Sequence, residues 1–234
     1  MGPRGLAVTL DGRIGETMRK FLEQSYKKEY EVLKGLFKAG YVEDRIERLN
    51  FIHEYTESIW DEYIKLIPNK TIQYLLIAES PPWSDEKTPQ YFLDPTSRSR
   101  LLMNAFKGAF DCNLPKYTPE NIINYFAEKG LLLIDSIPFS MCYKSVRRRP
   151  KYEELVNLSV KSYMLKKLIE SKFRFNKDMK IVFGYRVNAI HVMKSLNGVL
   201  DLNGNKFILN EKMICANYKS NYPDAGKIKE ILKL

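Results

Sequence analysis

Short apolar segments that alternate with helical segments are the feature that most constrains how this chain can fold. Residues 73–78, 131–135 and 180–184 are apolar almost throughout, and residues 212–216 form a fourth such segment. A run without polar alternation is typical of a strand buried on both faces of a sheet. Apolar residues at helical spacing predict helices between and after these runs, at residues 97–110, 118–130, 151–172, 184–196 and from about 224 onward. The order predicts an α/β fold of three α/β/α layers around a central, mostly parallel four-stranded sheet.

Two local signals mark element boundaries within this pattern. Thr118 followed by Pro119 is typical of a helix start, with the threonine as N-cap and the proline in the first turn. Asn203 followed by Gly204 is typical of a tight turn. Both signals are independent of the apolar periodicity.

A helical segment precedes the first predicted strand. Residues 14–39 and 42–66 carry apolar residues at spacings of three and four, and Pro68 stops the second helix. We therefore expect residues 1–70 to form an N-terminal helical hairpin, packed as an extension on an α/β domain of residues 71–234. These helices are also a candidate surface for a protein partner.

The positive charge of the chain is concentrated in one segment. The 234 residues include 38 Lys and Arg against 28 Asp and Glu, a formal net charge of +10. Residues 140–194 hold 14 basic and 4 acidic residues, so this stretch alone carries the whole excess. The densest part of this stretch consists of Lys144, Arg147, Arg148, Arg149 and Lys151. We expect these side chains to neutralise DNA phosphates and to gain affinity by releasing counterions. A solvated, lysine-rich surface without a ligand is the alternative.

Several classes of protein are excluded by composition. The chain has no run of about 18 apolar residues, so we expect no membrane-spanning helix, and its N-terminus lacks the long apolar core of a signal peptide. Its three cysteines are far apart and form no CxxC pair, which argues against a four-cysteine zinc or iron–sulfur site. The two histidines, His53 and His191, lack clustered partners. We expect an intracellular, cytoplasmic protein associated with DNA, without cofactor, metal or membrane partner.

Polar groups follow the predicted strands at the edge where an open α/β sheet binds its ligands. Glu79 and Ser80 come directly after the first strand, Asp135 ends the second, and Asn217 follows the fourth. A carboxylate at this edge can orient a water, accept a hydrogen bond from a base or act as a general base, and it can equally be a helix cap or an ion-pair partner. Aromatic residues in the same loops can stack on a base or close the top of the core; they include Tyr91, Phe92 and Tyr218.

Two short motifs resemble those of the uracil-DNA glycosylase superfamily. The first is AESPP at residues 78–82, which follows the first strand as the family's GQDPY, GEAPG or GxNPG loop does. The second is GLLLID at residues 130–135, which resembles the family's GVLLLN strand and has Asp135 at the position of the base-reading Asn. Tyr91 and Phe92 stand where the family keeps an aromatic that stacks on the base. With the order of strands and helices, the resemblance covers about residues 70–234.

The resemblance implies a DNA glycosylase-like protein that flips a base into a pocket and hydrolyses its N-glycosidic bond. Glu79 would order the water, Asp135 would read the base edge or activate the water, and Asn217 would stabilise the departing base. The implied catalytic residues are Glu79, Ser80, Asp135 and Asn217. The implied base-binding residues are Pro81, Tyr91, Phe92, Tyr218 and Lys219.

The chain departs from the family at the positions that decide activity. Ser80 stands where members with strong uracil excision have Asp or Asn, and a serine is not a base at neutral pH. The histidine of the family's HPS motif is missing, and Asn217 and Lys219 occupy that stretch. If Asp135 is ionised, it can only accept hydrogen bonds and favours an amino group on the base; if it is protonated, this restriction does not apply.

Excision of a damaged or deaminated base is the leading hypothesis. An inactive DNA- or protein-binding member of the fold and an enzyme of free nucleotides are the alternatives.

Overall fold

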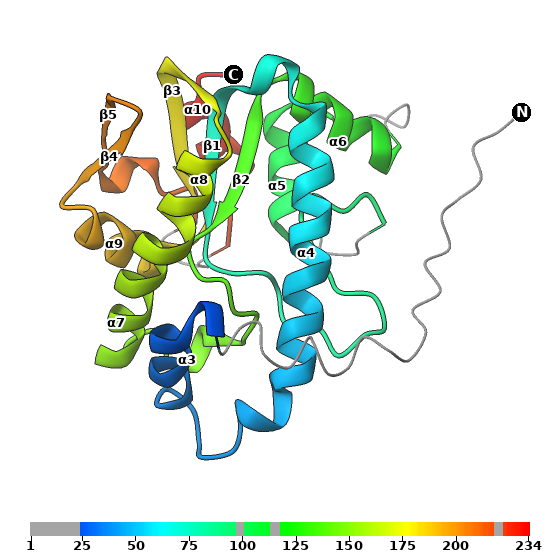
Figure 1. Ribbon diagram of the computed structural model, residues 1–234. Coiled ribbons are helices and arrows are strands. Elements are labelled where there is room, and N and C mark those ends of the chain that lie inside the picture. The colour runs from blue at the N-terminus through cyan, green and yellow to red at the C-terminus, as the bar shows by residue number, and fades with distance from the viewer. Residues whose placement is uncertain (1–23, 97–100, 113–117, 218–221) are drawn as a thin grey trace, which may run out of the picture.

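A parallel sheet of three strands forms the centre of the computed structural model, which describes residues 24–96, 101–112, 118–217 and 222–234 (Figure 1). The strands are β1 (Thr71–Ala78), β2 (Leu131–Asp135) and β3 (Arg174–Phe183), in the order β2-β1-β3. In the register of the central pair, Ala78 lies beside Asp135, so β1 and β2 end side by side. The carboxyl ends that the sequence marks as a candidate site are therefore brought together.

The predicted fourth strand is wrong for the part of the chain that is described. Residues 212–216 contribute a single parallel bridge between Ile214 and Phe183, and the Cys215 N–H donates to Phe183 O at 3.0 Å. The 3-10 turn η5 (Glu211–Met213) precedes this bridge, and an antiparallel bridge between Ala216 and Pro223 follows it. The segment turns away after one residue, which leaves it too short to pair as a strand.

Helices lie on both faces of the sheet. In Figure 1, α5 and α10 pack together behind it, and α7 and α9 pack together on the opposite side. The helices are α3 (Lys27–Lys34), α4 (Ile46–Leu66), α5 (Leu101–Ala109), α6 (Pro119–Glu128), α7 (Pro150–Ser159), α8 (Lys166–Glu170), α9 (Arg186–Ser195) and α10 (Ala225–Leu232). A π-helical segment, η4 (Val160–Leu165), joins α7 to α8, and short 3-10 turns occur at η1 (Glu43–Arg45), η2 (Pro68–Lys70) and η3 (Tyr143–Ser145).

The local boundary signals are confirmed. The Thr118 side chain caps α6 by accepting a hydrogen bond from the Asn121 N–H at 3.3 Å. The turn at Asn203 and Gly204 joins β4 (Val199–Leu202) to β5 (Asn205–Ile208) in a separate antiparallel hairpin. The helix predicted at residues 14–39 is regular only as α3, and its first ten residues lie outside the described ranges.

The N-terminal helices share one hydrophobic core with the sheet. Leu33, Leu36 and Leu49 are fully buried in the cluster that contains the central strand. α4 runs along the outer edge of β2, where Trp60 Nε1 donates to Leu133 O at 2.8 Å and the Tyr63 hydroxyl donates to Leu131 O. These bonds occupy carbonyl groups that an edge strand would otherwise leave unpaired. Residues 24–70 thus cover the sheet edge.

Gly130 is required by both the backbone conformation and the space before β2. It has a φ of +68°, and a Cβ there would lie 2.6 Å from the Thr71 carbonyl oxygen. Gly204 has a φ of +85° and nothing within 4 Å of the same position. The left-handed conformation costs an alanine about 1–2 kcal/mol at either site. We expect Gly130→Ala to lower the urea midpoint of unfolding well below that of Gly204→Ala, because only Gly130→Ala adds a backbone clash. Equal midpoints would contradict this account.

Candidate active site

A pocket of about 310 Å³ lies where β1 and β2 end. Its walls come from the loop after β1, the turn at Tyr91, the start of α5, and the residue that follows Gly184. The lining residues that carry a polar group or a ring are Ser80, Pro82, Gln90, Tyr91, Phe92, Asp135 and Tyr185. Four residues that the sequence marks as site candidates, Ser80, Tyr91, Phe92 and Asp135, therefore share one pocket.

Asp135 is a buried carboxyl without a complete set of partners. It is 3% exposed, and within the described residues its Oδ2 has no hydrogen-bond partner. Burial raises the pKa of Asp135 to about 8; the Lys167 ammonium opposes the shift, and the carboxylates of Glu57 and Glu79 add to it. The group is therefore mostly protonated at pH 7, and a protonated carboxyl can both donate and accept a hydrogen bond.

Glu79 lies in a buried ion pair and is not one of the residues that line the pocket. Its Oε1 accepts from Arg147 Nε at 2.7 Å and from the Tyr152 hydroxyl at 2.6 Å. Its Oε2 accepts from Arg147 Nη2, which makes the pair bidentate. Both carboxylate oxygens thus have donors within the protein, so Glu79 ties the loop after β1 to Arg147 and Tyr152.

A polar network continues from Glu79 through residues that sequence reasoning missed. The Tyr152 hydroxyl accepts from Asn188 Nδ2 at 3.2 Å. Asn188 Nδ2 also donates to Ser136 Oγ at 2.9 Å, and Ser136 Oγ donates to the Glu79 carbonyl oxygen at 3.1 Å. Since Tyr152, Asn188 and Ser136 are all buried, this network fixes α7 and α9 to the strand ends. The one sequence signal for it is a polar residue, Ser136, directly after an apolar strand.

The basic segment after β2 divides into inward and outward side chains. Arg147, expected to bind phosphate, is turned inward: its side chain is 17% exposed, pairs with Glu79 and lies 5.2 Å from the centre of the Tyr185 ring. The physical reason is that a buried carboxylate needs a charged partner, and the guanidinium fork matches it bidentately. Arg149 is exposed and donates one N–H to Leu36 O at 2.6 Å. The remaining predicted phosphate contacts are exposed; they are Lys144, Arg148 and Lys151.

The other predicted site residues lie in the core, outside the pocket lining or outside the described ranges. Pro81 is buried beside the pocket without lining it. The Phe92 ring packs against Phe106 and Phe126, with ring centres 5.5 and 6.0 Å apart, so most of it belongs to the core. Asn217 is exposed and is not among the residues that line the pocket. Tyr218 and Lys219 lie outside the described residues.

A second, partly buried ion pair lies close enough to influence Asp135. Lys167 Nζ is 2.6 Å from Glu57 Oε1 and 3.9 Å from the centre of the Trp60 ring, and the Tyr163 hydroxyl donates to the same oxygen at 2.9 Å. Tyr163 belongs to the π-helical segment, a conformation found frequently at functional sites. Because Glu57 holds the ammonium, Lys167 only partly offsets the burial of Asp135.

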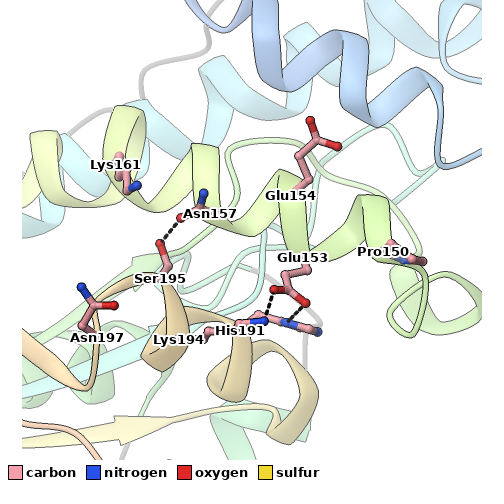
Figure 2. Close-up of a pocket in the computed structure, with 9 residues that line it drawn as sticks. All are labelled: Pro150, Glu153, Glu154, Asn157, Lys161, His191, Lys194, Ser195 and Asn197. Atoms are coloured by element: carbon pink, nitrogen blue, oxygen red, sulfur yellow. Dashed lines mark hydrogen bonds and ion pairs between the residues drawn. The ribbon is translucent and has the colours of Figure 1, made fainter.

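A larger hollow of about 590 Å³ lies between α7 and α9 (Figure 2). Glu153 pairs there with Lys194 and lies 3.7 Å from His191 Nδ1, and the Ser195 hydroxyl donates to Asn157 Oδ1 at 2.9 Å. These polar groups bond to one another across the hollow, as the dashed lines in Figure 2 show. His191 Nδ1 lines this hollow and, like Asp135 Oδ2, has no hydrogen-bond partner among the described residues. The pocket of Asp135 is the better candidate site because four residues that the sequence marks converge on it at the strand ends.

Comparisons of the chain with protein-family models, curated proteins and solved structures find no match. Among the described residues no group of three or more His, Cys, Asp or Glu is placed to hold a metal ion. No helix in the described ranges is long and apolar enough to cross a membrane. The chemistry of the pocket is therefore the basis of the functional proposal.

Proposed function

We propose that this chain binds DNA and hydrolyses the N-glycosidic bond of a damaged or deaminated base held in the pocket of Asp135. The observation that carries the proposal is the convergence of Ser80, Tyr91, Phe92 and Asp135 on one pocket at the strand ends. Enzymes that act on a flipped base hold it between aromatic or apolar side chains and read its edge by hydrogen bonds. Aromatic walls and a single buried carboxyl suit that task.

The protonation of Asp135 makes the pocket compatible with a deaminated base as the substrate. A protonated carboxyl donates one hydrogen bond and accepts one, which matches a ring N–H beside a carbonyl oxygen. Uracil, hypoxanthine and xanthine carry this pair of groups. An ionised carboxylate has no donor and would repel that carbonyl oxygen. A protonated carboxyl can also pair with cytosine or adenine, by donating to the ring nitrogen and accepting from the amino group, so protonation admits a deaminated base without selecting against the parent base.

Stabilisation of the leaving base is the contribution to catalysis that these residues support best. Ser80 is not a base at neutral pH, and the Glu79 carboxylate is paired with Arg147. The Asp135 O–H, by contrast, can donate to the oxygen on which negative charge develops as the glycosidic bond breaks. Catalysis would then rest on this hydrogen bond and on positioning of the water.

Base release is the direct test of the proposal. Full-length protein is incubated with single- and double-stranded oligonucleotides that contain uracil, hypoxanthine or xanthine, and the released base is measured by chromatography. We expect release of at least one of these bases, and loss of release in Asp135→Ala. No release from any substrate, with tight DNA binding retained, would reject the enzyme.

A catalytically inactive DNA-binding protein is the second candidate. The observations that favour it are the ion pair that occupies both oxygens of Glu79 and the placement of Asn217 outside the pocket lining. This candidate predicts that Asp135→Ala leaves DNA affinity nearly unchanged.

The exposed basic side chains give a prediction about salt. Each phosphate contact contributes about 0.7–0.9 to the slope of log affinity against log salt concentration. We expect the slope, measured by fluorescence anisotropy, to become shallower by about 2 to 3 when three contacts are removed; the variant replaces Lys144, Arg148 and Lys151 by alanine. A matched variant removes three exposed lysines on other elements and should keep the slope; it replaces Lys206, Lys212 and Lys233. Equal slopes for both variants would show that the basic segment makes no localised contact.

A further inference from the structure

Four side chains form a continuous array, which we call the aromatic–arginine ladder: Phe37, Tyr41, Arg45 and Trp83. The Phe37 and Tyr41 rings are stacked, with centres 5.4 Å apart and planes 15° from parallel. The Arg45 guanidinium lies 3.8 Å from the centre of the Tyr41 ring and 5.9 Å from that of Trp83. Flat rings and a flat cation thus follow one another along the surface.

The ladder is held in place and is partly open to solvent. Arg45 Nη1 donates to Tyr41 O at 3.1 Å, and Trp83 Nε1 donates to Asp85 Oδ2 at 3.3 Å. Tyr41 is 37% exposed, which is high for a large aromatic residue, and the other three members are half-buried. Side chains that already hold one another in place lose little conformational entropy when a planar ligand packs against their exposed parts.

The position of the ladder links the pocket to the basic segment. Trp83 follows Pro82, which lines the pocket, so one end of the ladder adjoins the pocket. At the other end the Phe37 ring lies 6.3 Å from that of Tyr143, and Leu36 O accepts the hydrogen bond from Arg149. In Figure 1, α3 and the first turns of α4 lie at the end of the molecule toward which β1 and β2 run.

We infer that the ladder binds the unpaired bases of single-stranded DNA that flank the base in the pocket. The inference rests on the proposed function only in taking DNA as the partner. Aromatic and arginine faces beside basic side chains stack on bases of any sequence, whereas the bases of a duplex have no free faces to offer. The ladder therefore gives the protein a preference for single strands over duplex.

Affinity for oligothymidine, measured by fluorescence anisotropy, tests the inference. We expect Tyr41→Ala and Trp83→Ala each to bind roughly ten- to a hundredfold more weakly, with a smaller loss for duplex. Tyr41→Phe keeps the ring and should bind as wild type does. Tyr125→Ala is a matched control, because Lys129 Nζ lies 5.2 Å from the centre of that ring at the far end of α6. Unchanged affinity in both ladder variants, or an equal loss in Tyr125→Ala, would overturn the inference.

Tryptophan fluorescence gives a second readout that does not depend on a destabilising change. The chain has two tryptophans, of which Trp60 is 2% exposed and Trp83 half-buried. Stacked bases quench indole emission, so we expect oligothymidine to quench the wild-type protein and to quench Trp83→Phe far less. Equal quenching of both proteins would contradict the ladder.

The inference and the proposed function can fail separately. Ladder variants that lose single-strand affinity, in a protein that releases no base, would leave the ladder intact and reject the glycosylase. A protein that releases base but binds oligothymidine equally well with and without the Tyr41 ring would reject the ladder alone.

Discussion

Asp135→Asn is expected to release base at pH 7 at nearly the wild-type rate and to lack the fall in rate that we expect of the wild type at high pH. Asp135→Ala is expected to release base roughly a hundredfold or more slowly. An asparagine side chain presents a donor and an acceptor in nearly the same shape as a protonated carboxyl. Because the pKa of Asp135 is about 8, the wild-type rate should fall about tenfold per pH unit above that value. The amide does not titrate, so the variant should stay flat.

The pH profile also separates the two roles that Asp135 could have. If the ionised carboxylate activated water as a general base, the wild-type rate would rise with pH until about pH 8, and Asp135→Asn would be inactive. That result would overturn the base-reading role. Asp178→Asn, a change of the same kind at an exposed carboxylate, serves as the control and should leave the profile unchanged.

The same titration predicts a dependence of stability on pH. Burial raises the pKa of Asp135 from 3.8 to about 8 in the folded state, so the folded protein binds more protons than the unfolded chain between these values. The free energy of unfolding must then fall as the pH rises from about 4 to 8 and level off above it. Asp135→Asn removes this loss and should be more stable than the wild type at pH 9 by up to about 6 kcal/mol. Urea unfolding of both proteins at pH 5 and pH 9 measures the difference.

Arg147→Met is expected to lower the free energy of unfolding by about 3–5 kcal/mol, since it leaves the buried Glu79 carboxylate without its charged partner. Glu79 is 6% exposed and receives three hydrogen bonds, two of them from this guanidinium. Arg148→Met changes the next residue of the same loop, which is exposed, and should shift stability by no more than about 0.5 kcal/mol. Thermal and urea unfolding of the two variants provide the comparison.

A double variant isolates the cause of that loss. Adding Glu79→Gln to Arg147→Met removes the uncompensated charge, so we expect part of the lost stability to return. Similar losses for Arg147→Met and Arg148→Met, or no recovery in the double variant, would mean that the ion pair does not hold the loop after β1.

The pattern of apolar residues was sufficient to predict the central strands and the location of the pocket. Continuous apolar runs need cover on both faces, and this requirement fixes β1, β2 and the end of β3 within a few residues. The same pattern wrongly predicted a fourth strand at residues 212–216. An apolar run indicates that a segment is buried, but it does not indicate whether the backbone pairs with a neighbouring strand. Ile214 and Cys215 are buried as expected, yet the described part of this segment pairs with β3 at one position only.

Long-range partners explain what sequence could not predict at the site. Three consecutive arginines are equivalent by composition, but Arg147 faces Glu79, 68 residues away, whereas Arg149 bonds to Leu36, 113 residues away. Tyr152 and Asn188 reach the strand ends from two different helices, and no local spacing reveals that they meet. Asp135 could be predicted because its strand position alone places it at the edge where ligands bind.

The contact between α4 and β2 affects how the chain folds during synthesis, because α4 is made before β2. Trp60 and the carbonyl that it bonds are 73 residues apart, so the helix leaves the ribosome well before the strand that it covers. When the β2 edge forms, its cover is already present on the same polypeptide. The exposed edge, which is the part of a sheet most prone to recruit a neighbouring chain into aggregates, therefore has only a brief lifetime during synthesis.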